Sequence, residues 1–133
     1  MPVATIIYTY LAMTVTFLAV DLLWLGIVAK NFYQGQIGML MKDSPNWTAA
    51  LIFYALFIVG IMVFAVLPHY QKNSFAETLL YGALFGFFTY MTYELTNYAV
   101  LKDWPLPIVF VDIVWGVVLA SVVSLAGYFV ARI

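Results

Sequence analysis

Residues 90–116 read YMTYELTNYAVLKDWPLPIVFVDIVWG. Two apolar stretches in this segment flank a short polar turn, which holds the charged pair Lys102 and Asp103. Glu94, Asn97 and Asp112 lie inside or at the edges of the apolar stretches. Ionisable groups inside a membrane-spanning segment are rare, and by default they mark a functional site. The segment therefore predicts a helical hairpin that crosses a bilayer and carries a polar site.

The composition of the whole chain is that of a membrane protein. Of its 133 residues 66% are hydrophobic and 8% are charged, whereas a soluble domain carries about 25% charged residues. The net charge of -1 and the absence of a basic cluster argue against nucleic acid as a partner. Because the chain has no cysteine and a single histidine, His69, we expect no metal site and no cofactor. The expected surroundings are the lipid bilayer.

Four apolar segments are long enough to cross a hydrocarbon core of ~30 Å as helices. The predicted spans are residues 3–28, 47–67, 75–98 and 107–131. The connection at residues 29–46 combines turn formers with an amphipathic pattern, which predicts a short interfacial helix after the first span. The predicted fold class is all-α: a polytopic membrane protein with a four transmembrane helix bundle, forming one domain over residues 1–133.

Four spans place both termini on the same side of the membrane. Lys30, Lys42 and Lys102 lie on one side, and Lys72 and Arg132 lie on the other. This difference is too small for the positive-inside rule to decide the orientation. The sequence also leaves open whether the bundle acts alone or as a homo-oligomer.

Three acidic residues lie at matching depths in the predicted spans. Asp21 precedes the end of the first span by seven residues, Glu94 precedes the end of the third by four, and Asp112 follows the start of the fourth by five. Because successive spans alternate in direction, all three lie in one half of the bilayer, roughly 6 to 10 Å below its surface at ~1.5 Å per residue. We expect them to converge on one interior cavity.

A short acid–aromatic motif occurs twice. Asp21 and Trp24 in the first span have the same spacing of three residues as Asp112 and Trp115 in the fourth, so each pair shares a helical face. The first and fourth spans run in opposite directions. The repeat therefore predicts a pseudo-symmetric pair of sites at similar depth.

The third predicted span has one face of small and polar residues. Five residues recur on it at steps of three and four, with Glu94 on the flank: Gly82, Gly86, Tyr90, Tyr93 and Asn97. Glycines four residues apart allow another helix to approach closely. A comparable ladder of small residues in the fourth span consists of Gly116, Ala120 and Ser124.

The same residues also allow structural readings. A carboxylate near a helix start, such as Asp112, complements the helix dipole and caps free amides. Asp21 and Glu94 lie toward helix C-termini, where a negative charge is unfavourable unless a proton, a lysine or a bound cation offsets it. Trp104 is expected to be an interfacial anchor, and His69 a solvated loop residue.

Blocks spread over nearly the whole chain resemble a known family: Asp21-x-x-Trp24-Leu25-Gly26, Phe32-Tyr33, Gly38, Thr92-Tyr93-Glu94-Leu95-Thr96-Asn97, Trp104-Pro105 and Asp112-Ile113-x-Trp115-Gly116. The chain is similar to the bacterial predicted membrane proteins of domain-of-unknown-function family 2177, which are small four-span inner-membrane proteins. The resemblance implies the bacterial inner (plasma) membrane and supplies no activity. Glu94 stands where an aspartate is expected more often. Size and span count are also similar to the small multidrug-resistance transporters, but their motifs do not match.

The leading hypothesis is a site that binds or translocates a small cation, a proton or an amine-bearing solute. Its expected residues are Asp21, Trp24, Tyr93, Glu94, Asn97, Asp112 and Trp115. Clustered carboxylates in a low dielectric cannot all stay ionised, so at least one of Glu94 and Asp112 is expected to hold a proton near neutral pH until a cation displaces it. Aromatic walls would add cation–π attraction.

Two alternatives stay open. A membrane-embedded enzyme acting on a lipid or isoprenoid would use paired carboxylates, but the chain has no Asp-x-x-Asp motif and no catalytic residue can be assigned. A structural or accessory membrane subunit would pair its acids with Lys30 and Lys102 and pack its conspicuous faces against another protein.

Overall fold

Each apolar segment forms a helix in the computed structural model, which describes all 133 residues. The structure is all-α, as the sequence predicts. Three of its helices continue directly into short turns of π or 3-10 type. The elements are α1 (Val3–Leu23) with a π-helical turn at Trp24–Val28, α2 (Lys30–Ile37) with a 3-10 turn at Gly38–Leu40, α3 (Trp47–Ile61) with turns at Met62–Val66 and Leu67–His69, α4 (Phe75–Val100) and α5 (Leu106–Val130).

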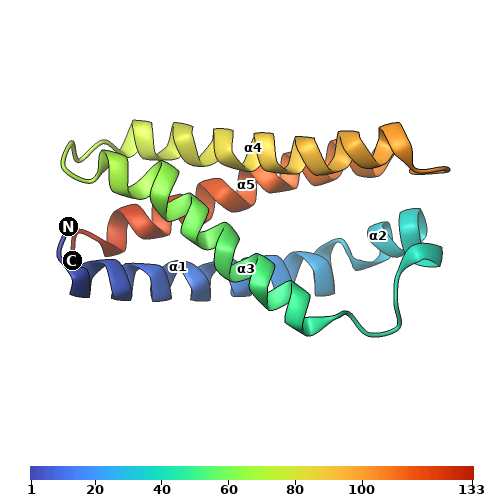
Figure 1. Cartoon of the computed structure of the whole chain (residues 1–133), viewed down its shortest axis with the longest axis horizontal. Helices are drawn as coiled ribbons and strands as arrows, with labels where there is room; N and C mark the ends of the chain where they lie inside the picture. Colours follow the sequence, from blue (N-terminus) through green and yellow to red (C-terminus); the bar gives the residue numbers. More distant parts are fainter.

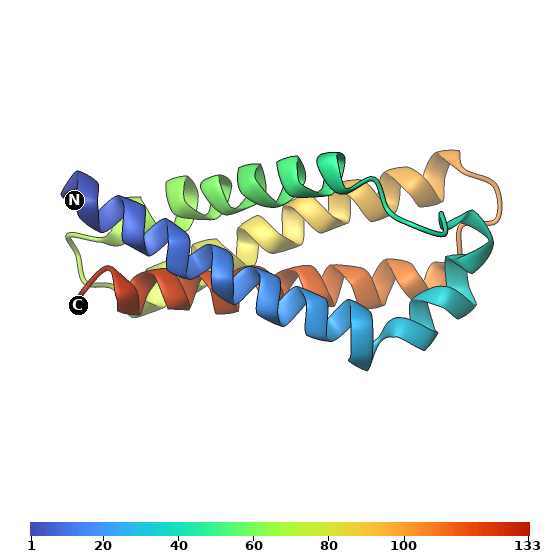
Figure 2. The ribbon, with the colours of Figure 1, turned by 90° about the horizontal axis from the view of Figure 1, so that it is seen from below.

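The long helices form a bundle with both termini at one end and α2 at the other (Figure 1). α4 and α5 run antiparallel along most of their length, and α1 also packs against α5. α3 crosses the other helices obliquely, and its first half leans away from α4 (Figures 1 and 2). The arrangement leaves the α2 end of the bundle wider than the end with the termini.

Three helices are long and apolar enough to cross a membrane: Val3–Val28, Trp47–His69 and Leu106–Val130. They correspond closely to the first, second and fourth predicted spans, so the structure confirms that these three segments form apolar helices of membrane-spanning length. α4 has 26 residues and is as long as these helices, but its sequence is less apolar and it is not one of the three.

The close contact predicted at Gly82 and Gly86 is confirmed. A Cβ atom added at Gly82 would lie 2.7 Å from the Cβ of Ser124, and one added at Gly86 would lie 2.8 Å from the Cβ of Ala120. The added atom at Gly86 would also collide with the backbone carbonyl of Gly116. The glycines of α4 therefore fit against the small-residue ladder of α5, and the two backbones approach where other residues would hold them apart.

The expected interfacial helix is shorter than the segment assigned to it. Only Lys30–Leu40 is helical, and residues 41–46 form an irregular connection. The helix also does not simply lie along the surface, because the Tyr33 side chain is buried against α5. α2 therefore closes one end of the bundle.

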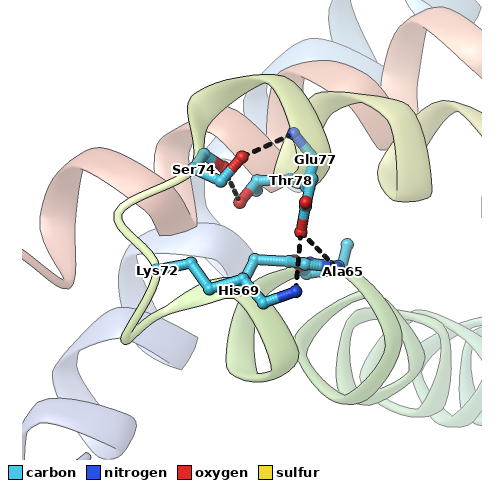
Figure 3. Close-up of polar contacts among 6 residues, drawn as sticks. All are labelled: Ala65, His69, Lys72, Ser74, Glu77 and Thr78. Atoms are coloured by element: carbon cyan, nitrogen blue, oxygen red, sulfur yellow. Dashed lines mark hydrogen bonds and ion pairs between the residues drawn. The ribbon is translucent and has the colours of Figure 1, made fainter.

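The expectation that His69 is a solvated loop residue is wrong. His69 is 5% exposed, and its Nδ1 lies 2.8 Å from the carbonyl oxygen of Ala65 (Figure 3). Its Nε2 lies 3.6 Å from a carboxylate oxygen of Glu77. The physical reason is Pro68, which lies in the 3-10 turn that ends α3 and cannot continue the α-helical hydrogen bonding. The turn lays the imidazole against Tyr81 of α4, with 4.7 Å between ring centroids.

The start of α4 is tied to the same cluster. The Ser74 hydroxyl accepts a hydrogen bond of 3.1 Å from the Glu77 backbone amide, which is a helix N-cap (Figure 3). Lys72 donates to the Glu77 carboxylate at 3.2 Å. The acid at this end of the bundle thus has a cationic partner, Lys72, and lies next to the His69 ring.

Candidate functional site

Asp21 is held by a tryptophan from the opposite motif. It lies in the last turn of α1 and is 5% exposed. The indole nitrogen of Trp115 in α5 donates to Asp21 Oδ1 at 3.1 Å. This is the only hydrogen bond of the carboxyl group, and Oδ2 has no protein partner.

The two tryptophans of the repeated motif stack on each other. The rings of Trp24 and Trp115 lie 4.4 Å apart with an interplanar angle of 7°. The Trp24 nitrogen donates to the Tyr33 hydroxyl at 3.3 Å. The two motif copies therefore meet between the antiparallel helices α1 and α5, and neither tryptophan donates its hydrogen bond to the aspartate of its own motif.

Asp112 is held by α2. The Tyr33 hydroxyl donates to Asp112 Oδ1 at 2.8 Å. Burial first, and the Asp112 carboxylate second, raise the pKa of Tyr33, so its hydroxyl stays a donor at neutral pH. Asp112 is the seventh residue of α5, beyond the first turn, and no side chain caps this helix. The dipole effect falls off within the first turn, so the helix-capping reading of Asp112 is wrong.

Glu94 lies behind Asp112. It is 1% exposed, and the indole nitrogen of Trp104 donates to Glu94 Oε2 at 3.1 Å. The Glu94 and Asp112 carboxyl groups are also within hydrogen-bonding reach of each other. A hydrogen bond between two carboxyl groups requires a proton on one of them. Trp104 is 9% exposed, so it serves this acid pair and is not the interfacial anchor that the sequence suggested.

No basic side chain offsets these acids. Both ion pairs of the structure are made by Glu77 at the other end of the bundle. Lys30 and Lys102 are exposed and form no ion pair with Asp21, Glu94 or Asp112. The pairing expected for a structural or accessory subunit is therefore absent from the structure. The acids also do not come together as a group of three metal ligands.

A cavity of about 430 Å³ lies beside Asp21 and Asp112. Its walls come from α1, α3, α4 and α5, and most of them are apolar or aromatic. The lining residues are Asp21, Leu25, Ala50, Phe53, Tyr54, Phe57, Thr89, Tyr90, Tyr93, Asp112 and Trp115. We call this space the acid cavity.

The structure brings most, but not all, of the predicted site residues to this cavity. Asp21, Tyr93, Asp112 and Trp115 line it. Trp24 and Glu94 do not line the cavity but contact residues that do. Trp24 stacks on Trp115, and Glu94 lies within hydrogen-bonding reach of Asp112. Asn97 is half-buried on α4 and does not line the cavity.

Sequence reasoning did not select Tyr33, Tyr90 or Trp104 as site residues. Tyr90 lines the cavity, and the other two donate to the acids. The signal for Tyr33 and Trp104 was their presence in the blocks of family resemblance. Tyr90 shares its helical face with Gly86 and Tyr93, which is the signal that this position points inward.

A family model described as "Predicted membrane protein (DUF2177)" matches residues 6–129. No curated protein and no solved structure matches the chain. The match extends from the first turns of α1 to the last turn of α5, so it includes every residue of the acid cavity.

Proposed function

The chain belongs to the DUF2177 family of predicted membrane proteins, and on that premise we propose that its acid cavity binds or translocates an amine-bearing organic cation. The observation that carries the proposal is that Asp21 and Asp112 line one aromatic cavity while no basic side chain pairs with either. The first, second and fourth predicted spans, together with α4, would form one four-span domain in the bacterial inner membrane, with both termini on one side. Glu94 and Glu77 lower the hydropathy of α4, and the burial of Glu94 against α5 would offset its cost inside the bilayer.

Electrostatics favours a cation. An ionised carboxylate in a low-dielectric interior is costly unless a positive charge or hydrogen bonds compensate it. Asp21 has one hydrogen bond and no cationic neighbour. A bound cation would supply the missing charge, and the faces of Tyr54, Tyr90 and Trp115 would add cation–π attraction.

Size and ligand number favour an organic cation over a bare metal ion. The acid cavity, at about 430 Å³, falls within the ~300–1,000 Å³ typical of small-molecule sites. A metal ion needs several ligands at short range, and no group of three such side chains exists. An organic cation with its ammonium group next to Asp21 and its carbon skeleton against Phe53 and Phe57 would contact both the acidic and the aromatic part of the cavity wall.

Proton exchange follows from the carboxyl pair. If one proton lies between Glu94 and Asp112, a cation at Asp112 has to displace it or share the charge. The binding equilibrium then releases a proton, so the affinity for the cation rises as the pH rises.

The test is binding of phenethylammonium to the purified protein in lipid nanodiscs. We expect saturable binding that strengthens with pH and is lost in Asp21→Asn and in Asp112→Asn. Asp103→Asn is the matched control, because Asp103 is an exposed acid in the α4–α5 turn. Absence of saturable binding, or equal binding in all three variants, would overturn the proposal. Turnover of a lipid or isoprenoid that depends on the same acids would instead support the enzyme alternative.

A further inference from the structure

We infer that the acid cavity is reached sideways from the lipid, between α3 and α4, and that its occupant is an amphiphilic amine with a long apolar tail. The inference rests on the proposed cation site and specifies its substrate class. It is carried by the positions of the open and the closed sides of the cavity.

The open side faces the hydrocarbon. The first half of α3 leans away from α4 (Figures 1 and 2), and the two meet through the turn at Met62–Val66. Phe53 of α3 and Tyr93 of α4 both line the cavity and are 47% and 55% exposed. Counted from Trp47 and Val100 at ~1.5 Å per residue, these side chains lie roughly 10 Å inside the ends of their helices. The opening therefore lies at the depth of the acyl-chain carbons that are nearest to the headgroups.

On the α2 side, buried residues cover the acids. Ala29 and Tyr33 on the α2 side and Trp104 from the α4–α5 turn pack together with Ile108 and Val109. Tyr33 and Trp104 are each 9% exposed. Both are fixed by hydrogen bonds to the acids below them, so a hydrated solute meets a plug of two aromatic side chains.

An amphiphilic amine fits this geometry. Such a molecule already lies in the bilayer with its charged group near the headgroups and its tail among the acyl chains. Lateral movement through the opening would bring the ammonium to Asp21, whose free Oδ2 has no protein partner, while the tail stays in lipid or against Phe53. A short hydrophilic amine would have to cross hydrocarbon without a tail to hold it there.

The cysteine-free sequence permits a direct experiment. A single cysteine is placed at the opening by Phe53→Cys, and its labelling by a membrane-permeant maleimide is timed in nanodiscs with dodecylammonium or ethylammonium present. At about ten times its Kd a ligand slows labelling about tenfold. We expect that slowing with dodecylammonium, none with ethylammonium at the same concentration, and its loss when Asp21→Asn is added. Leu56→Cys is the matched control, because Leu56 is exposed on α3 and does not line the cavity.

Each other outcome overturns the inference, and two of them overturn the cation site as well. Equal protection by both amines overturns lateral access by an amphiphile and leaves the cation site standing. Protection by neither amine overturns the cation site as well. Protection by dodecylammonium that persists in the Asp21→Asn background shows an apolar cleft without a role for the acid, and overturns both. Slowing at Leu56→Cys equal to that at Phe53→Cys reduces the effect to partitioning of the amine into lipid, and overturns the inference.

Discussion

The two ends of the bundle differ in whether their charged side chains have partners of opposite charge. At the end that holds the termini, Glu77 pairs with Lys72 and His69, and the Arg132 guanidinium donates to Asn73 and to two backbone carbonyls. At the α2 end three buried acids have aromatic donors but no cationic partner.

Both ends contain a hollow of similar volume, about 440 Å³ at the termini and about 430 Å³ at the α2 end. The hollow at the termini is lined by Arg132 and has no acidic residue in its wall, whereas the acid cavity contains Asp21 and Asp112 and no basic residue.

This difference suggests a division of the bundle into a scaffold, formed by the end with the termini and the α4–α5 contact, and a site, formed by the acid cavity at the α2 end. A buried carboxylate without a cationic partner is costly to keep ionised, and such costs are retained mainly where a ligand or a reaction needs them. The unpaired acids would destabilise a loosely held bundle, so the closely packed α4–α5 contact has to hold them in place. The following variants test each part of that division.

The largest effect is expected at the α4–α5 contact. In the double variant Gly82→Leu with Gly86→Leu the new side chains would meet the α5 backbone at Gly116 and the side chains of Ala120 and Ser124. Overpacking costs about 1–3 kcal/mol even where a core can adjust, and at Gly86 the added atoms would meet the backbone of Gly116, which cannot move aside as a flexible side chain can. We expect loss of the folded bundle, measured by thermal unfolding and by size-exclusion chromatography in detergent.

Gly26→Ala with Gly35→Ala is the control for that variant, because a Cβ atom added at Gly26 or Gly35 meets no atom within 4 Å. A double leucine variant that unfolds at the wild-type temperature would show that the two helices are not in close contact. The α4–α5 contact could then no longer be regarded as the rigid part of the bundle that holds the buried acids in place.

A moderate effect is expected when Glu94 loses its donor. Trp104→Phe keeps an aromatic ring in the plug and removes the indole nitrogen that donates to Glu94 Oε2. Leaving a buried acceptor without its partner costs about 1–3 kcal/mol. Unfolding titrations should show this loss, whereas Trp47→Phe, at a tryptophan that is 51% exposed, should unfold like the wild type. Equal stability of the two variants would return Trp104 to the role of an interfacial anchor.

The part of the fold that follows from hydropathy could be predicted from the sequence. A bilayer permits only helices with satisfied backbones or closed barrels, so long apolar segments predict the helices and their alternating directions. These directions place Asp21, Glu94 and Asp112 toward the same end of the bundle. The Gly82–Gly86 contact was also predictable, because spacing alone places the two glycines on one face.

The side-chain partners could not be predicted. An aromatic residue at the edge of a span has the same sequence signal whether it faces the headgroups or turns inward, and Trp104 and Tyr33 turn inward because α2 and the α4–α5 turn fold back over the bundle. For His69, Pro68 signalled the end of a helix. The burial of the imidazole depends on Tyr81 and Glu77, which become its neighbours only after the chain has turned.

A change of one bound proton is expected at the carboxyl pair. Because Glu94 and Asp112 are within hydrogen-bonding reach and lack a cation, we predict that one of them holds a proton near neutral pH. Infrared spectra of the purified protein should contain a protonated-carboxyl band that disappears or shifts in Glu94→Gln or Asp112→Asn. Asp43→Asn, at an exposed acid in the connection before α3, should leave the band unchanged. A spectrum without this band at neutral pH would mean an ionised network, and the proton-exchange step would have to be abandoned.

The smallest effect is expected where the charges are paired. Glu77→Gln removes the carboxylate that pairs with Lys72 and His69 but keeps the Ser74 cap, because the cap uses the backbone amide. The Glu77 side chain is 43% exposed, and pairs in such positions contribute roughly 0–1 kcal/mol because water screens them. Thermal unfolding should therefore change slightly, by no more than this amount, against Asp103→Asn as an exposed and unpaired control. A loss of stability as large as that of Trp104→Phe would show that the end with the termini also depends on a buried charge, and the contrast between a paired scaffold and an unpaired site would no longer hold.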